Sequence, residues 1–319
     1  MTGPAAGVGA APGATRVIAI VGPTAAGKSA LSLELAAELG GEVINADSMQ
    51  LYRGMDIGTA KLTGAERRGI LHHLLDIWDV TQPASVAEYQ RLARSAIDDV
   101  AGRGRVPLLV GGSGLYIRAA LENFEFPGTD AGLRAELEAR LAASGPAALY
   151  AELKDADPAA AAKILPTNGR RIVRALEVIE LTGEPFTAAL PDPTPVYDTV
   201  QIGVDVETPV IDQRVADRVQ HMWDAGFVAE VTGLLPAGLA GALTASRALG
   251  YQQVLAFLAG ECSEETAKSD TVLGTRRFVR RQRKWFRRDR RIVWLDGAAG
   301  DLVPTALNAI AATGENVES

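Results

Sequence analysis

The chain has 319 residues, 47% of them hydrophobic, and a formal net charge of −7. This length allows one large domain or two modest ones, each with a substantial core. No apolar run approaches the roughly 18 residues of a membrane-spanning helix, so a protein of that class is excluded. The single cysteine, Cys262, excludes an intramolecular disulfide and a metal site built from several cysteines.

The first fifteen residues are small, uncharged and rich in Gly and Pro. They have neither the basic start nor the apolar centre of a signal peptide. We therefore expect residues 1–15 to be a flexible tail on a cytoplasmic protein.

A buried strand is predicted at 17–21, followed by a glycine-rich turn and an amphipathic helix at 28–39. The turn matches G-x-x-x-x-G-K-[ST], the phosphate loop, and a purely structural turn is the alternative. In this motif the glycines let backbone amides face an anion, the lysine reaches the terminal phosphates, and the serine hydroxyl ligates Mg²⁺. The residues predicted to bind a diphosphate or polyphosphate are Gly22, Pro23, Thr24, Ala25, Ala26, Gly27, Lys28 and Ser29, with Ser29 on the metal.

Asp47 lies just past a second predicted strand at 42–46. In open α/β sheets ligands bind at that edge, one strand away from the phosphate loop. Asp47 is therefore expected to act as a general base or a metal partner, and capping of a turn is the structural alternative. The adjacent His72 and His73 precede another short strand or extended segment, and we expect them to be structural because no third metal ligand is suitably spaced.

Ser113 lies in a second glycine-rich turn, after a third predicted strand at 105–110. Its structural role would be the N-cap of the next helix. The turn nevertheless leaves the same edge of the sheet as Gly22 and Asp47, so the hydroxyl is a candidate for the same cleft.

From about residue 121 to residue 197, strand-like runs give way to segments rich in Ala, Glu and Arg. Helix start and stop signals in this stretch predict an all-helical insertion. Its helices are predicted at 131–143, 146–154, 158–164 and 170–182.

After the insertion, an apolar strand at 199–206 and a helix at 209–225 restore the earlier pattern, and a last strand is predicted at 292–295. The alternation indicates an α/β fold with a parallel sheet of about five strands and a helical insertion. The predicted parts are the tail at 1–15, the core at 16–120 and 198–300, the insertion at 121–197 and a C-terminal tail at 301–319.

Residues 276–291 contain ten Lys or Arg and one acidic residue, Asp289, which gives a local charge of +9 in an acidic protein. One interpretation is an electrostatic footprint for a polyanion such as a nucleic acid. The other is a solvated helix face balanced by acidic residues on neighbouring elements.

Seven segments occur in the order GPTAAGKS, ADSMQLYRGMDIGTAK, HHLLDI, PLLVGGSGLY, RRIVRALEV, SRALGYQQ and RQRKWFRRD. With them, about residues 17–295 resemble the bacterial tRNA dimethylallyltransferases, also called tRNA isopentenyltransferases. The most specific part is D-S-x-x-x-Y-x-G-M-D-I-G-T-A-K. The resemblance implies a fold similar to P-loop nucleotide kinases, a monomer, and dimethylallyl transfer from dimethylallyl diphosphate to the N6 amine of the adenosine 3′ of the anticodon in tRNA.

The resemblance also implies roles for individual residues. Asp47 would be the general base, and Ser113 and Arg247 would complete the catalytic set. The residues implied to contact tRNA are Asp47, Ser48, Met49, Gln50, Ser113, Arg134, Arg170, Arg171, Arg174, Arg247, Gly250, Tyr251, Gln252, Arg280 and Arg281. Relatives often read P-N-D where this chain has Pro166, Thr167, Asn168 and Gly169, which leaves that turn and its RNA contact open.

Two other functions fit part of the pattern. A P-loop kinase for a small molecule or nucleotide would bind ATP at the loop and use Asp47 on a hydroxyl acceptor, but it has no need of the basic run. A non-enzymatic RNA-binding GTPase or ATPase is disfavoured because we find no convincing D-x-x-G or N-K-x-D motif. A Rossmann dehydrogenase is excluded because the turn is not G-x-G-x-x-G.

Overall fold

The computed structural model describes residues 15–124, 126–186 and 194–315. Most of the predicted N-terminal tail, and the exit of the insertion at Pro191 and Pro193, lie outside these residues. The chain divides into two compact units, Met1–Asn123 with Thr194–Ser319 and Phe124–Pro193, which we call the core unit and the helical unit. The insertion predicted at 121–197 begins and ends a few residues outside the helical unit.

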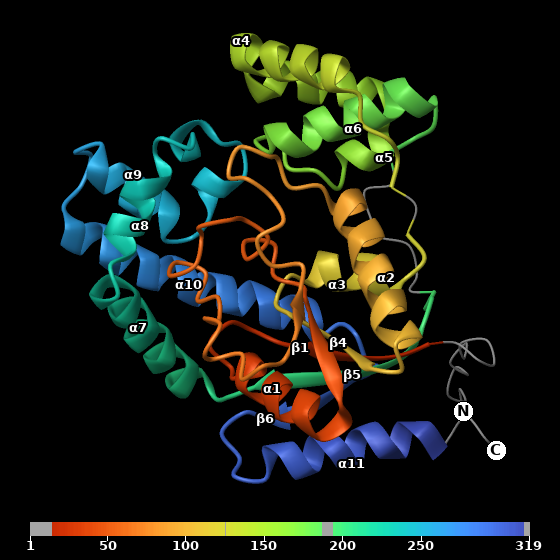
Figure 1. Cartoon of the computed structure of the whole chain (residues 1–319). Helices are drawn as coiled ribbons and strands as arrows, with labels where there is room; N and C mark the ends of the chain where they lie inside the picture. The colour runs from red at the N-terminus through yellow and green to blue at the C-terminus, as the bar shows by residue number, and fades with distance from the viewer. Residues whose placement is uncertain (1–14, 125, 187–193, 316–319) are drawn as a thin grey trace. The chain divides into compact units, whose positions relative to one another are not determined.

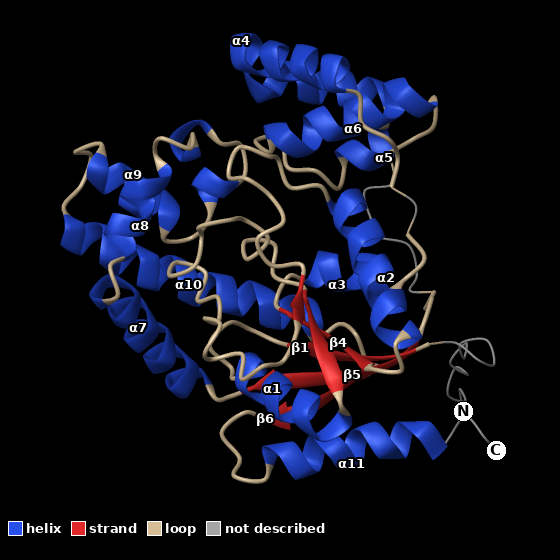
Figure 2. Ribbon diagram, in the orientation of Figure 1, coloured by secondary structure: helices blue, strands red, loops and turns tan. Residues whose placement is uncertain are grey.

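The core unit contains a parallel sheet with helices around it (Figure 2). Its six strands are hydrogen-bonded in the order β3-β2-β4-β1-β5-β6. The strands are β1 Arg16–Val21, β2 Gly41–Asn45, β3 His72–His73, β4 Val106–Gly111, β5 Asp198–Asp205 and β6 Ile292–Asp296. The α/β prediction is confirmed, but its count of about five strands was one too low. β3 lies at the histidine pair itself, directly before the short strand or extended segment that the sequence predicted. A two-residue strand is too short to show an apolar pattern.

Helices cover both faces of the sheet because its central strands are apolar on both sides. In β1, Val17, Ala19 and Val21 belong to one buried cluster and Ile18 and Ile20 to another, as the two-residue period of a strand requires. The first cluster contains side chains of α2 Val86–Gly102 and α3 Gly114–Leu121, and the second those of α1 Lys28–Leu39, α7 Thr208–Asp224 and α11 Leu302–Glu315.

The predicted C-terminal tail is wrong over its first part, since α11 begins at Leu302. Ala306 and Ile310 of α11 are buried, and Figure 1 shows the helix alongside α1. The segment consists mostly of small and uncharged residues, so its sequence shows only a weak helical pattern and the helix was not predicted. The other helices of the core unit are α8 Phe227–Leu234, α9 Tyr251–Leu258 and α10 Glu264–Phe286, with short 3-10 turns at Leu239–Gly241 and Ala245–Arg247.

The helical unit consists of α4 Ala131–Ala156, α5 Pro158–Ala161 and α6 Gly169–Thr182. α4 is interrupted at Gly145, which has a φ of 75°, where the sequence predicted the gap between two helices. Leu137, Leu153 and Ile172 belong to the separate apolar cluster of this unit. Asn168 caps α6 by accepting a hydrogen bond from the Arg171 amide, so the turn without P-N-D still has a side-chain cap.

The parallel sheet brings the carboxyl ends of its strands to one edge. The glycine-rich turn starting at Gly22 follows β1, Asp47 follows β2, and the turn containing Ser113 follows β4. Because β4 lies between β1 and β2, the Ser113 turn lies between the other two segments. No helix in the described parts of the chain is long and apolar enough to cross a membrane.

Candidate active site

The turn between β1 and α1 has a backbone that demands glycine at its start. Gly22 has a φ of 137°, and an added Cβ would lie 2.2 Å from the carbonyl oxygen of Val204 on β5. No other residue fits such a position without moving the strand. The loop is therefore packed directly on the sheet, and α1 begins immediately after it at Lys28.

Lys28 is folded back over this loop, where its Nζ donates a hydrogen bond to the Pro23 carbonyl at 2.7 Å. Burial lowers the pKa of Lys28 to about 8, and the negative charge of Asp47 opposes this shift. An ammonium that is poorly solvated and close to a carboxylate gains from a bound anion. The ammonium of Lys28 is thus poorly solvated in the protein alone, which is consistent with the prediction that it binds a phosphate.

Asp47 lies in a turn that the side chain of Asn45 stabilises through two hydrogen bonds to the Asp47 backbone. The Asn45 side chain accepts from the Asp47 amide at 2.9 Å and donates to the Asp47 carbonyl at 3.1 Å. Asp47 Oδ1 accepts from the Met49 amide at 2.9 Å, which is the turn-capping contact considered above. Its other carboxylate oxygen accepts no hydrogen bond from any described residue, so capping uses only half of the group.

Ser113 lies at the N-cap position of α3, but its hydroxyl makes no capping hydrogen bond. Ser113 is therefore the N-cap residue by position, as predicted, but its hydroxyl is not used for capping. Ser113 Oγ instead accepts from the Ser48 amide at 3.2 Å and donates to Ser48 Oγ at 3.3 Å. The Ser113 turn and the Asp47 turn are thus joined by side-chain contacts.

Arg218 of α7 is a site residue that the sequence did not reveal. It donates to the Thr59 carbonyl at 3.1 Å, as does Gln50 through its amide. Burial lowers the pKa of Arg218, and the charge of Asp47 opposes the shift, while Arg218 in turn lowers the pKa of Lys28. Lys28 and Arg218 are therefore both close enough to Asp47 to feel its charge, and Asp205 at the end of β5 acts on Lys28 as well. Arg218 follows Lys28 by nearly 200 residues and carries no motif.

Several residues implied to contact tRNA have structural partners. Tyr251 is fully buried and its hydroxyl donates to Glu230 at 2.6 Å, so a direct RNA contact by this side chain is wrong for this structure. The adjacent Gly250 is also buried, whereas Gln252 and Arg247 are exposed.

Two arginines of the helical unit, Arg134 and Arg174, both bind the carboxylate of Glu177, whose side chain has no exposed surface. The charge-assisted hydrogen bonds from the two arginines offset the free-energy cost of burying the Glu177 carboxylate. Arg170 and Arg171, at the first turn of α6, are exposed. Two of the four arginines therefore pair with a buried carboxylate, and the other two are exposed.

The basic segment divides in the same way. Arg276 and Arg280 of α10 pair with Asp212, and Arg283 and Arg287 pair with Asp205 at the end of β5. Arg281 lies over the ring of Phe278, with 5.6 Å between the guanidinium carbon and the ring centroid. The interpretation as a face balanced by acidic residues is confirmed for the four arginines that pair with Asp212 and Asp205, and the footprint for a polyanion stays a prediction for the residues that face solvent. The exposed residues for which the described chain offers no salt bridge are Arg277, Arg281, Lys284, Arg288 and Arg290.

A metal site made of protein ligands alone is absent from the described residues, where no three His, Cys, Asp or Glu side chains are grouped to hold an ion. The exposed Ser29 hydroxyl, in the first turn of α1, is the oxygen donor nearest in sequence to Lys28. A single hydroxyl suits Mg²⁺ only when phosphate oxygens and water supply the remaining ligands.

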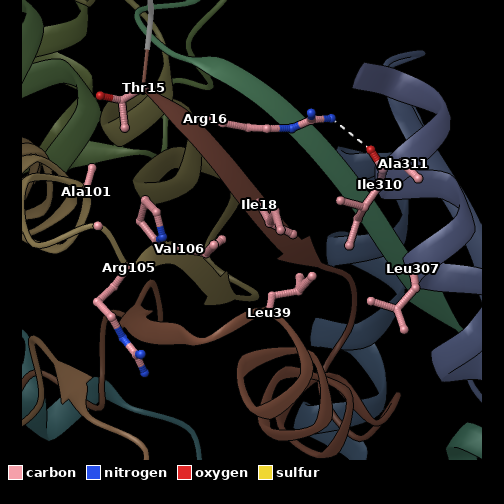
Figure 3. Close-up of a pocket in the computed structure, with 12 residues that line it drawn as sticks. Thr15, Arg16, Ile18, Leu39, Ala101, Arg105, Val106, Leu307, Ile310 and Ala311 are labelled. Carbon is pink, nitrogen blue, oxygen red and sulfur yellow. Dashed lines mark hydrogen bonds between the residues drawn. The ribbon is translucent and has the colours of Figure 1, made fainter. Parts of the chain in front are cut away.

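The opposite edge of the sheet, where the strands begin, has a different character (Figure 3). A cavity of about 590 Å³ lies there between Arg16, Val106 and side chains of α11 such as Leu307. Arg16 donates to the carbonyl of Ile310 at 2.8 Å. None of the predicted site residues lines this cavity.

The family model described as IPP transferase matches residues 50–289, a range that includes Arg218 and α10 but begins after Lys28 and Asp47. A protein named tRNA dimethylallyltransferase from Salinispora arenicola is 70% identical over 296 residues, which are 93% of this chain and 86% of that protein.

Two solved structures extend this comparison. The full-length tRNA isopentenylpyrophosphate transferase from Bacillus halodurans is 40% identical, with a TM-score of 0.71 over 94% of this chain and 97% of the other. A eukaryotic dimethylallyltransferase acting on tRNA is 27% identical, with a TM-score of 0.80 over 95% of this chain and 80% of the other. The similarity therefore includes both the core unit and the helical unit.

Proposed function

The chain belongs to the IPP transferase family, and we propose that it transfers the dimethylallyl group of dimethylallyl diphosphate to the N6 amine of the adenosine immediately 3′ of the tRNA anticodon. The observation that carries this proposal is the placement of two cations, Lys28 and Arg218, around the carboxylate of Asp47. Lys28 and Arg218 suit a diphosphate, and both lie within electrostatic reach of Asp47.

The cationic side of the site serves the leaving group. As the bond between the allylic carbon and the diphosphate oxygen breaks, the electron pair stays on diphosphate, whose growing charge must be neutralised. Lys28, Arg218 and the amides of the loop from Gly22 supply positive charge and hydrogen-bond donors there. Mg²⁺ held by Ser29 would add Lewis-acid stabilisation of the same oxygens.

The carboxylate side serves the acceptor. An exocyclic adenine amine is a weak nucleophile, so removal of its proton as the new C–N bond forms assists the attack. Asp47 has one carboxylate oxygen engaged by the Met49 amide and the other available for that proton. Asn45 holds the backbone of Asp47 and thereby orients the base.

The acceptor base must leave its stack in the anticodon loop to reach Asp47. Phosphate contacts would hold the stem and loop while carrying no sequence information themselves. We assign these contacts to the exposed arginines, Arg170 and Arg171 of α6 and Arg281 with its exposed neighbours on α10. The protein would act as a cytoplasmic monomer on one tRNA.

The direct test is incubation of the protein with labelled dimethylallyl diphosphate, Mg²⁺ and tRNA, followed by mass spectrometry of the nucleosides. We expect label on N6 of a single adenosine. A matched tRNA with guanosine at that position, which has oxygen at C6, should stay unlabelled. Calorimetric titration adds a second readout, since tight ATP binding with turnover to ADP on a small acceptor would overturn the proposal.

A further inference from the structure

Gln282 is a neutral, buried residue within the basic stretch of α10. Only 5% of its surface is exposed. Its Oε1 accepts a hydrogen bond from the Thr24 amide at 3.0 Å, and its Nε2 donates to the Gly112 carbonyl at 3.0 Å. One side chain of α10 thus joins the glycine-rich turn after β1 to the glycine-rich turn after β4.

The chemistry of these two contacts requires a carboxamide. Thr24 presents an N–H group and Gly112 presents a carbonyl, so the bridging group needs one acceptor and one donor at the end of a single side chain. There is no spare room, because a Cβ added to Gly112 would lie 2.4 Å from Gln282 Nε2. The side chain of Gln282 therefore packs closely against Gly112 and joins the two turns directly.

The contacts continue from Gly112 to the carboxylate. Ser113 follows Gly112, and its hydroxyl accepts from the Ser48 amide and donates to the Ser48 hydroxyl. Ser48 follows Asp47, whose carboxylate accepts from the Met49 amide. A continuous path of hydrogen bonds and adjacent residues therefore runs from the loop that holds the leaving group to the base that serves the acceptor.

We propose that Gln282 is a positioning residue, which sets the distance between the diphosphate loop and the Ser113 and Asp47 turns. This inference rests on the proposed prenyl transfer, in which the leaving diphosphate and the attacking amine must be held on opposite sides of one carbon atom. With that function, the diphosphate would contact mainly the turn after β1, and the adenosine amine would contact mainly the Asp47 turn. Loss of the bridge should therefore disturb alignment for reaction more than the binding of either substrate.

The test uses two substitutions of the full-length protein. Gln282→Met keeps the length of the side chain and removes both hydrogen bonds. Gln282→Glu keeps the acceptor for the Thr24 amide but turns an oxygen toward the Gly112 carbonyl. For each variant we would measure the single-turnover rate with both substrates saturating, and the Kd of each substrate separately by calorimetry.

Gln282→Met should react about 10- to 100-fold more slowly, the range expected for a small misplacement of reacting groups, with each Kd changed by less than about 3-fold. The rate of Gln282→Glu divided by that of Gln282→Met should rise as the pH falls, because the neutral acid regains a donor for the Gly112 carbonyl. Taking this ratio cancels the titration of Asp47 and of the substrates.

The matched control is Val279→Ala, one turn earlier on the same helix. Val279 is buried in the second apolar cluster and contacts neither turn through a hydrogen bond. This variant should lower the Tm and leave the single-turnover rate of the folded protein near wild type. If Gln282→Met also loses rate only in proportion to its folded fraction, or shows no pH-dependent difference from Gln282→Glu, the positioning role is refuted. The wild-type rate in the same assay tests the proposed function itself, so either failure can be recognised separately.

Discussion

Two carboxylates near opposite ends of β2, those of Glu42 and Asp47, differ in how far the protein itself neutralises their charge. Glu42, near the start of the strand, is 3% exposed and binds Arg103 and His73, each at 2.7 Å through Oε2. The Arg103 hydrogen bonds outweigh the effect of burial and lower the pKa of Glu42 to about 2. Asp47, just past the other end of the strand, has a single backbone hydrogen bond to its carboxylate and two cations nearby.

The contrast separates charges that stabilise the fold from charges available to a ligand. A buried carboxylate with its hydrogen bonds satisfied within the protein has little capacity left for a substrate. A carboxylate with an open oxygen beside incompletely solvated cations is typical of a functional site. Substitution of each should therefore affect a different measurable quantity.

The largest effect is expected for Asp47→Asn. Asparagine keeps an oxygen that accepts from the Met49 amide, so the turn should be retained. It cannot take up the proton of the amine, and the single-turnover rate should fall by roughly 10²- to 10⁴-fold, the usual contribution of general acid–base catalysis. Affinity for both substrates should change little.

The same experiment distinguishes the other roles of Asp47. If the carboxylate mainly holds Mg²⁺, the substitution should weaken diphosphate binding, and higher Mg²⁺ should restore part of the rate. If it only caps the turn, stability should fall by about 1 kcal/mol or less while the rate is retained. A single-turnover rate near wild type would remove Asp47 from the catalytic residues.

Glu42→Gln should affect stability instead. Glutamine keeps the shape but loses the charge that holds Arg103 and His73, and because Arg103 is half exposed we expect a loss of about 2 kcal/mol, below the usual cost of breaking a buried pair. Urea unfolding at pH 7 measures this loss. The rate per folded molecule should be unchanged.

The pH dependence of that stability has a defined sign. The pKa of Glu42 is lowered from 4.5 to about 2 on folding, so the unfolded chain binds the proton more tightly. The contribution is complete above about pH 4.5 and is lost as the pH falls from there toward 2. The difference between wild type and Glu42→Gln should shrink over that window, and a difference independent of pH would contradict the role assigned to Glu42.

The sequence was sufficient for the parts of the fold that depend on local pattern. Apolar runs gave β1, β2, β4, β5 and β6, and the glycine spacing gave a turn whose backbone indeed requires glycine at Gly22. Motif positions also brought Lys28 and Asp47 to the same edge of the sheet. These features depend on neighbours within a few residues, which a single sequence displays.

Contacts between distant segments could not be read in that way. Arg218 lies on a helix without a motif, and Gln282 lies in the segment RQRKWFRRD, of which only the basic residues were interpreted. The contacts of both side chains depend on which distant segments lie beside them. For Tyr251 the sequence led to the opposite mistake: it predicted a contact with tRNA for a side chain that is buried and hydrogen-bonded to Glu230. A motif indicates that a residue matters without saying whether it contacts the substrate or the protein.

The smallest expected effect concerns the basic helix α10, where the same contrast between paired and open charges occurs within a few residues. Arg283 donates to both oxygens of Asp205, and its side chain is 15% exposed. Lys284 and Arg288 are exposed, and neither forms a salt bridge within the described part of the chain. Only exposed cations without an acidic partner, such as Lys284 and Arg288, are available to neutralise phosphates of a nucleic acid and thereby release its counterions.

Substituting Lys284 and Arg288 together by Gln should weaken tRNA binding several-fold at physiological salt and flatten the slope of log Kd against log salt by about one unit for each lost contact. Affinity for dimethylallyl diphosphate should stay the same, because neither side chain belongs to the diphosphate site. Arg283→Gln is the matched comparison: it breaks the contacts with Asp205 and should lower the free energy of unfolding while leaving the salt slope unchanged. Filter binding at four or five salt concentrations measures both slopes. A slope unchanged in the double variant would mean that the whole basic segment is a solvated face, and that tRNA is held by other residues such as Arg170 and Arg171.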